Sequence, residues 1–179
     1  MYRAEAEGSF DSWHQDDLDD LEPRVCRLLL ERLDYTTVLD LGSGKGAFTA
    51  TLARPGAKIV GVDASETAVE IARARHPDIE WVASPLERHL DAAPPVDLIV
   101  AKQVLSYLED WRAIVAACAA RCRFFLVSLY LPQDPIGFVK SHAELEEELR
   151  RHFRPVETVY LASRSIGIHL VESVSQPSP

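Results

Sequence analysis

One run of nine residues, 38–46, constrains the fold of this chain more than any other stretch. It reads Val-Leu-Asp-Leu-Gly-Ser-Gly-Lys-Gly, and the helix-compatible residues 47–52 follow it. An apolar strand, a glycine-rich turn and a helix together form a cradle for a nucleotide. Glycine suits such a turn because the tight backbone angles and the close approach of a ligand both disfavour a Cβ atom. The run therefore predicts an α/β sheet that holds a nucleotide-type ligand at its carboxyl edge.

The identity of that ligand depends on the acids around the glycines. Asp63 ends a second apolar run about twenty residues after Gly42, where a carboxylate can hold a ribose diol. Gly42, Gly44 and Ala47 also satisfy the dinucleotide pattern G-x-G-x-x-G/A, so the glycines alone leave NAD open. Asp40 argues against NAD, because a pyrophosphate is anionic and is repelled by a carboxylate at the mouth of its loop. S-adenosylmethionine instead carries an ammonium and a sulfonium, and an acidic strand end attracts both.

At this point the chain resembles the class I S-adenosylmethionine-dependent methyltransferases. Residues 40–46 match their first motif, roughly acid-x-Gly-x-Gly-x-Gly, and Asp63 matches their second, an acid at the end of the next strand. The resemblance implies S-adenosyl-L-methionine as cofactor, S-adenosyl-L-homocysteine as product and a small-molecule acceptor. The cofactor contacts that it implies are Asp40, Leu41, Gly42, Ser43, Gly44, Gly46, Asp63, Ala64, Ser84, Pro85, Leu86 and Lys102.

The rest of the chain alternates strands and helices. Strands are expected over 36–41, 58–62, 79–83, 96–101 and 124–131, and helices over 18–33, 46–53, 66–75, 85–90, 110–121 and 143–153. Two further β-rich runs, 156–163 and 166–174, have no helix between them and should pair as an antiparallel hairpin. We therefore expect a Rossmann-like, doubly wound α/β sheet of five parallel strands plus this hairpin, with helices on both faces. All 179 residues form one expected methyltransferase domain, with a lid segment over 1–17 and a disordered tail over 175–179.

Composition narrows the class of partner. The net charge of −9 argues against a nucleic-acid enzyme, which binds phosphates through clustered Lys and Arg. The three cysteines form no C-x-x-C pair, so no metal site is expected. No apolar run is long enough to span a bilayer, and residues 1–7 lack the plan of a signal peptide. These features predict a cytoplasmic protein.

Three side chains are candidates for the chemistry. Methyl transfer from a sulfonium mainly requires alignment of the nucleophile, although an amine or hydroxyl acceptor must also lose a proton. Tyr107 follows the expected strand 96–101, where many relatives have histidine or tyrosine, and its phenol could orient the acceptor. Lys102 ends the same strand and could serve as a base if desolvated. His142 follows the loop after the fifth strand and is a third candidate base.

The acceptor side is expected to come from the N-terminal segment and the end of the fifth strand. Phe10 and Trp13 precede the first helix, where relatives fold a lid, and Tyr130 ends strand 124–131. Residues 9–13 and 104–108 look like small-molecule methyltransferases of the nodulation N-methyltransferase type and of bacterial natural-product pathways. Because the chain has few insertions, its acceptor pocket is either small and open or completed by a second subunit, as in a homodimer.

Three functions stay open at this point. The first is methyl transfer to nitrogen or oxygen of a small metabolite. The second is a non-catalytic protein that binds S-adenosylmethionine, since no unmistakable general base is present. The third is an NAD-dependent oxidoreductase, which Asp40 and the short chain disfavour.

Overall fold

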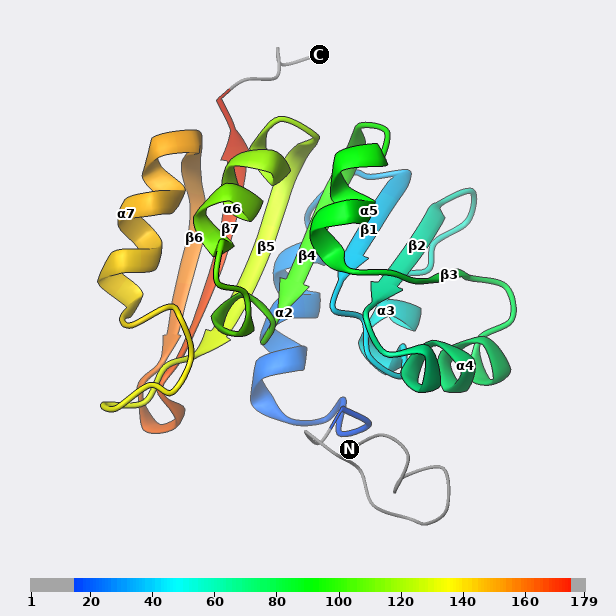
Figure 1. Cartoon of the computed structure of the whole chain (residues 1–179), viewed down its shortest axis with the longest axis horizontal. Coiled ribbons are helices and arrows are strands. Elements are labelled where there is room, and N and C mark those ends of the chain that lie inside the picture. Colours follow the sequence, from blue (N-terminus) through cyan, green and yellow to red (C-terminus); the bar gives the residue numbers. More distant parts are fainter. Residues whose placement is uncertain (1–14, 175–179) are drawn as a thin grey trace.

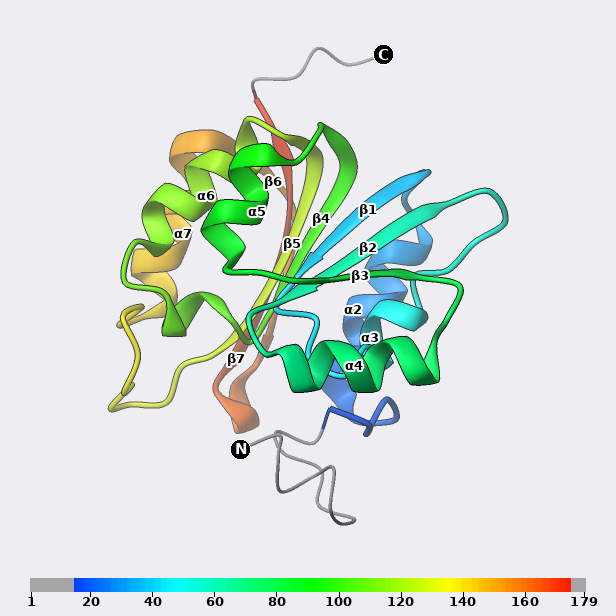
Figure 2. The same ribbon diagram turned by 45° about the vertical axis from the view of Figure 1, so that its right-hand side comes forward.

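The computed structural model describes residues 15–174, which form a seven-stranded sheet covered by helices on both faces (Figures 1 and 2). The strands are β1 (Thr37–Leu41), β2 (Lys58–Asp63), β3 (Glu80–Ala83), β4 (Val96–Lys102), β5 (Cys122–Tyr130), β6 (Phe153–Leu161) and β7 (Ile166–Ser173). The helices are α2 (Leu21–Glu31), α3 (Ala47–Ala50), α4 (Glu66–Arg75), α5 (Leu86–Ala92), α6 (Trp111–Ala119) and α7 (His142–His152), with two 3-10 turns, η2 (Leu105–Tyr107) and η3 (Ala162–Arg164).

The strand order is β3-β2-β1-β4-β5-β7-β6. β1 to β5 pair in parallel, and β7 is antiparallel to both of its neighbours, β5 and β6. The predicted fold class is therefore confirmed, and the terminal hairpin joins the sheet through its second strand. The chain reverses its winding between β1 and β4, so this is the point where open α/β sheets bind ligands.

The two faces of the sheet carry separate apolar cores. α5, α6 and α7 cover one face, where Phe125, Trp111 and Leu145 are buried, while α2, α3 and α4 lie on the other (Figures 1 and 2). Cys26 and Leu30 of α2 pack there against the strands. Side chains alternate along each strand, so neighbouring residues at a strand end face opposite cores.

Element bounds differ from expectation by up to three residues, in strands as well as helices; β6, expected over 156–163, spans Phe153–Leu161. α4 spans the predicted residues, and the hydroxyl of its N-cap Ser65 accepts a hydrogen bond from Ala68 N. α2 begins at Leu21, after its N-cap Asp20, and not at residue 18, with Pro23 in the first turn, where proline fits. α3 is one turn long, because the chain tightens into i→i+3 bonds from Thr51 N to Phe48 O onward.

Asp97 anchors the edge of the sheet opposite to the ligand edge. Its Oδ2 accepts hydrogen bonds from the backbone and hydroxyl groups of Thr36 and Thr37, at 2.7–2.9 Å. Despite partial burial, these four donors lower the pKa of Asp97. The contact ties the start of β4 to the start of β1, the two strands that flank the switch point.

Candidate functional site

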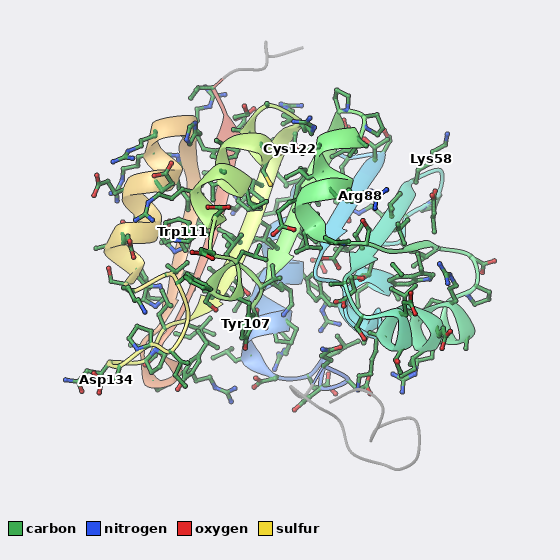
Figure 3. The ribbon with its side chains drawn as sticks, in the orientation of Figure 1. Lys58, Arg88, Tyr107, Trp111, Cys122 and Asp134 are labelled. Carbon is green, nitrogen blue, oxygen red and sulfur yellow. The ribbon has the colours of Figure 1, made fainter. Side chains whose placement is uncertain are left out.

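A cavity of about 670 Å³ lies at the carboxyl edge of the parallel strands, on the face covered by α2 and α3. This size is within the range of small-molecule sites. Tyr107 stands at this edge, near the start of α2 (Figure 3). The lining residues are Gln15, Asp17, Leu18, Asp20, Glu22, Pro23, Asp40, Gly42, Ser43, Ala47, Phe48, Asp63, Lys102, Gln103, Val104, Tyr107, Tyr130 and Ile166.

The glycine-rich loop is held against β2 by main-chain and carboxylate contacts. Gly42 N and Ser43 N both donate to Val62 O, at 2.8 and 3.0 Å. Asp63 accepts from Gly44 N through Oδ2 at 2.9 Å and from Ser65 N through Oδ1 at 2.8 Å. A carboxylate has about four lone-pair sites, so both oxygens keep capacity for a further donor such as a ribose hydroxyl.

Two glycines of the loop are required by neighbouring side chains. Gly46 has φ +82°, and a Cβ there would lie 2.3 Å from the Trp81 ring. Gly44 has φ +54°, and its Cβ would lie 2.2 Å from Gln15 Oε1. Both glycines are outside the cavity lining. Packing against Trp81 explains Gly46, and contact with Gln15 explains Gly44.

Residues 15 and 16 form a strap over the loop. Gln15 Oε1 accepts from Lys45 N at 2.9 Å, and Asp16 bridges Lys45 and Arg75 at 3.1 and 2.8 Å. Lys45 is buried beneath this strap. The strap belongs to the segment 1–17, whose role as a lid stays a prediction; Phe10 and Trp13, the predicted aromatic lid residues, lie outside the described residues.

Asp40 is a buried acid at the wall of the cavity. Its side chain lies on the α2 face and is 3% exposed, and Thr49 Oγ1 donates to its Oδ2 at 2.6 Å. Burial raises the pKa of Asp40 to about 7; Asp63 adds to the rise, while the Thr49 hydroxyl and the Lys102 ammonium oppose it. A cation that enters the cavity next to Asp40 would restore its charge. Ser43 Oγ, on the same wall, is buried and has no hydrogen-bond partner in the described part of the chain.

Lys102 and Glu22 form an ion pair across the cavity floor. Lys102 Nζ lies 2.5 Å from Glu22 Oε2 and 4.8 Å from the centre of the Phe48 ring. Ser128 Oγ donates to the other carboxylate oxygen of Glu22. Lys102 and Ser128 are register partners in β4 and β5, so both point to the α2 face, where Glu22 meets them. Glu22 was missed from the sequence, because an acid in the first turn of a helix is ordinary there.

The other end of the cavity is aromatic. Tyr130 and Ile166 are register partners at the ends of β5 and β7, and both line the cavity with Tyr107 of η2. The two tyrosine side chains are 58% (Tyr107) and 53% (Tyr130) exposed. Partial burial raises the pKa of Tyr107, so its phenol is neutral and can donate or accept.

Several expected site residues lie outside the lining. Ala64, Ser84 and Pro85 are beside Asp63, as shown by the bond from Ser84 N to Asp63 O at 3.0 Å, but they do not line the cavity. Leu86 is a buried core side chain, and the side chain of Leu41 also belongs to that core.

His142 is also away from the cavity. It begins α7, where its Nε2 lies 3.3 Å from Ser165 O and its ring packs on the edge of Tyr160. Within residues 15–174, no three His, Cys, Asp or Glu side chains are arranged to hold a metal ion. No helix in the same range is long and apolar enough to cross a membrane.

Comparisons with known proteins agree on one enzyme class. Residues 38–123 match the family model described as a methyltransferase domain. The chain is 36% identical over 141 residues to trans-aconitate 2-methyltransferase of Azoarcus sp. (strain BH72), covering 76% of this chain and 43% of that protein. It is 33% identical over 106 residues to a ubiquinone biosynthesis O-methyltransferase of Mesorhizobium japonicum, covering 57% and 41%. The chain thus spans less than half the length of these curated relatives.

Solved structures share the whole fold. The N-methyltransferase NodS from Bradyrhizobium japonicum WM9, in complex with S-adenosyl-L-homocysteine, aligns with a TM-score of 0.75 over 91% of this chain and 92% of its own, at 21% identity. Magnesium protoporphyrin IX methyltransferase from Synechocystis PCC 6803, with bound S-adenosylmethionine, aligns with a TM-score of 0.68 over 91% and 80%, also at 21% identity. At these identities the likeness concerns the fold.

Proposed function

We propose that this chain, which belongs to the class I S-adenosylmethionine-dependent methyltransferases, transfers a methyl group from S-adenosyl-L-methionine to a nitrogen or oxygen of a small-molecule acceptor. The observation that carries the proposal is the buried Asp40 carboxylate in the wall of the cavity beside the glycine loop. A buried acid whose pKa is raised to about 7 favours a cationic ligand over a pyrophosphate.

The residues present fit this cofactor. Asp63 has spare acceptor capacity for the ribose diol, and Asp40 offers the negative charge for the ammonium and sulfonium. The unpartnered Ser43 hydroxyl provides a further polar contact on the same wall. We assign Lys102 to the carboxylate of the methionine part, because it is the basic side chain of the described lining. Ala64, Ser84, Pro85 and the main chain at Leu86 remain the proposed neighbours of the adenine.

Catalysis on this proposal is mainly alignment. When bound, the cofactor supplies a methyl group already activated on a sulfonium, which a nucleophile displaces directly. The chain's own part is to hold the acceptor against that methyl and to exclude water, which the strap at Gln15 and the wall at Val104 support. Tyr107 is the proposed orienting group. Lys102 is ion-paired with Glu22, and His142 is outside the cavity, so we propose neither residue as the general base.

Calorimetry against S-adenosyl-L-homocysteine and NAD tests the ligand class. Binding of S-adenosyl-L-homocysteine and no binding of NAD supports the proposal. Binding of NAD and no binding of S-adenosyl-L-homocysteine would instead favour an oxidoreductase. Transfer of labelled methyl to a metabolite in a cell extract then separates an enzyme from a non-catalytic binding protein. A cytoplasmic location, a homodimer and the absence of nucleic-acid binding stay predictions; the oligomeric state is measured by light scattering on the purified protein.

A further inference from the structure

We propose that the acceptor is an uncharged or cationic molecule with an apolar or aromatic body, and that the site rejects anionic acceptors. This inference rests on the proposed methyltransferase function and names the substrate class of that same site. It follows from how charge and apolar surface are divided along the cavity.

The cavity runs along the strand ends, and its two halves differ. Asp63, Gly42 and Ser43 line it beyond β2 and β1, the half assigned to the cofactor. Lys102 ends β4 in the middle, and Tyr130 and Ile166 line it beyond β5 and β7. Because the sheet order is β2-β1-β4-β5-β7, the acceptor half is the one built on β5 and β7.

The charges of the described lining are predominantly negative. Five of its side chains are carboxylates, those of Asp17, Asp20, Glu22, Asp40 and Asp63, and one is basic, Lys102. Lys102 is held by Glu22, and Asp20 is held by Arg164 at 2.5 Å. Asp17 accepts a hydrogen bond from the backbone of Asp20 and has no cationic partner among the described residues.

The cofactor does not reverse this balance. Its ammonium, sulfonium and carboxylate sum to one positive charge, and Asp40 and Asp63 face that half of the cavity. An anionic acceptor would therefore enter a site of its own sign, in which the one described basic side chain, Lys102, is paired with Glu22 and is assigned to the carboxylate of the cofactor. Like charges that share a cleft repel over several ångströms at the effective dielectric of a protein surface.

The acceptor half of the cavity presents aromatic surface. Tyr107 and Tyr130 expose about half of their surface there, and Phe138 N donates to Ser106 O at 2.7 Å, which joins the 131–140 loop to η2. The same loop carries Lys140, which is outside the cavity lining and whose Nζ donates to Gly137 O at 2.6 Å. Exposed aromatic side chains at a cavity mark a binding surface, and aromatic faces also attract cations.

Three probes that share a phenylethyl group test the proposal: 2-phenylethylamine, 2-phenylethanol and 3-phenylpropionate, which are cationic, neutral and anionic at pH 7. Each is titrated by saturation-transfer NMR into protein that calorimetry has shown to be saturated with S-adenosyl-L-homocysteine. We expect the amine and the alcohol to bind at least tenfold more tightly than the carboxylate. Failure of the homocysteine compound to bind would count against the proposed function before any probe is added.

A charge-reversal pair makes the test specific to the cavity. Asp17→Lys should lower the preference for the amine over the carboxylate at least threefold. Glu31→Lys, an exposed acid at the far end of α2, makes the same change in net charge and should leave the preference unaltered. Equal or tighter binding of the carboxylate, no binding of any probe, or the same shift in both variants would overturn the inference.

Discussion

The Asp40→Asn variant should be more stable than the wild type at alkaline pH but should bind the cofactor more weakly. Burial raises the pKa of this carboxyl from 3.8 to about 7. Each tenfold change in proton affinity corresponds to 1.36 kcal/mol, so ionised Asp40 costs the folded protein about 4 kcal/mol relative to the unfolded chain. Asparagine has no titratable proton and keeps an oxygen that can accept from Thr49.

The sign of the pH dependence follows from the raised pKa. The unfolded chain releases the Asp40 proton near pH 4, whereas the folded protein holds it up to about pH 7. The contribution of Asp40 to stability is therefore complete below pH 4, falls as the pH rises through this window and levels off above it. The advantage of Asp40→Asn over the wild type should grow by about 2–3 kcal/mol between pH 5 and pH 8.

Urea unfolding of both proteins at these two pH values measures the difference. The matched control is Glu87→Gln, which changes an exposed acid in the first turn of α5. Its difference from the wild type in free energy of unfolding should be the same at both pH values. If the Asp40→Asn advantage is the same at both pH values, Asp40 is not a buried acid with a raised pKa and the reasoning fails.

Cofactor binding should show the opposite preference. S-adenosylmethionine favours ionised Asp40, so its affinity for the wild type should rise up to tenfold per pH unit below pH 7 and level off above it. Asp40→Asn should bind more weakly at pH 8 and lose this dependence, which calorimetry at pH 6 and pH 8 would show. If the affinity of the wild type does not change with pH, the cationic part of the cofactor does not bind next to Asp40.

Three further substitutions address the other acids and the phenol. Asp63→Ala should weaken the binding of S-adenosyl-L-homocysteine by about 2–3 kcal/mol, measured by calorimetry, because charge-assisted hydrogen bonds to the ribose diol are lost; unchanged affinity would show that Asp63 does not contact the ligand. Glu22→Ala should lower the free energy of unfolding by about 3 kcal/mol, because it leaves the mostly buried Lys102 ammonium without its carboxylate partner; the double variant Glu22→Ala, Lys102→Met should recover part of that loss, and no recovery would contradict an ion-pair origin. Tyr107→Phe should lower kcat with the true acceptor at least tenfold while leaving the affinity for S-adenosyl-L-homocysteine unchanged; intact turnover would show that the phenol has no part in orienting the acceptor.

Local signals were sufficient to predict the fold. The alternation of apolar runs with helical patterns specified the parallel strands and both helical layers, and the missing helix between 156–163 and 166–174 specified the hairpin. Ser65 and Ser141 cap α4 and α7 through hydroxyls that accept from first-turn N–H groups, and such contacts are local in sequence. Helix ends were less accurate, as at α3, where tertiary contacts decide how far the turn continues.

The site could be predicted only where its residues are adjacent in sequence or follow a strand. Glu22 pairs with Lys102, eighty residues away, and nothing local marks either residue for the other. His142 follows a loop at the ligand edge, but α7 turns its first residue toward Tyr160 on the other face. Gly46 fits a ligand motif, yet the Trp81 ring accounts for it. Long-range packing determined all three outcomes.

The three inner acids of the cavity have different partners, and this difference assigns their roles. Glu22 has the Lys102 ammonium, Asp63 has two backbone N–H groups, and Asp40 has a single hydroxyl. Burial therefore leaves Asp40 as the acid whose charge a bound cation can still change. On the proposed function, ionised Asp40 would hold the donor more strongly than the product, because the product lacks the sulfonium charge that the donor carries. The buried charge that lowers the stability of the empty site would then favour exchange of product for donor after each transfer.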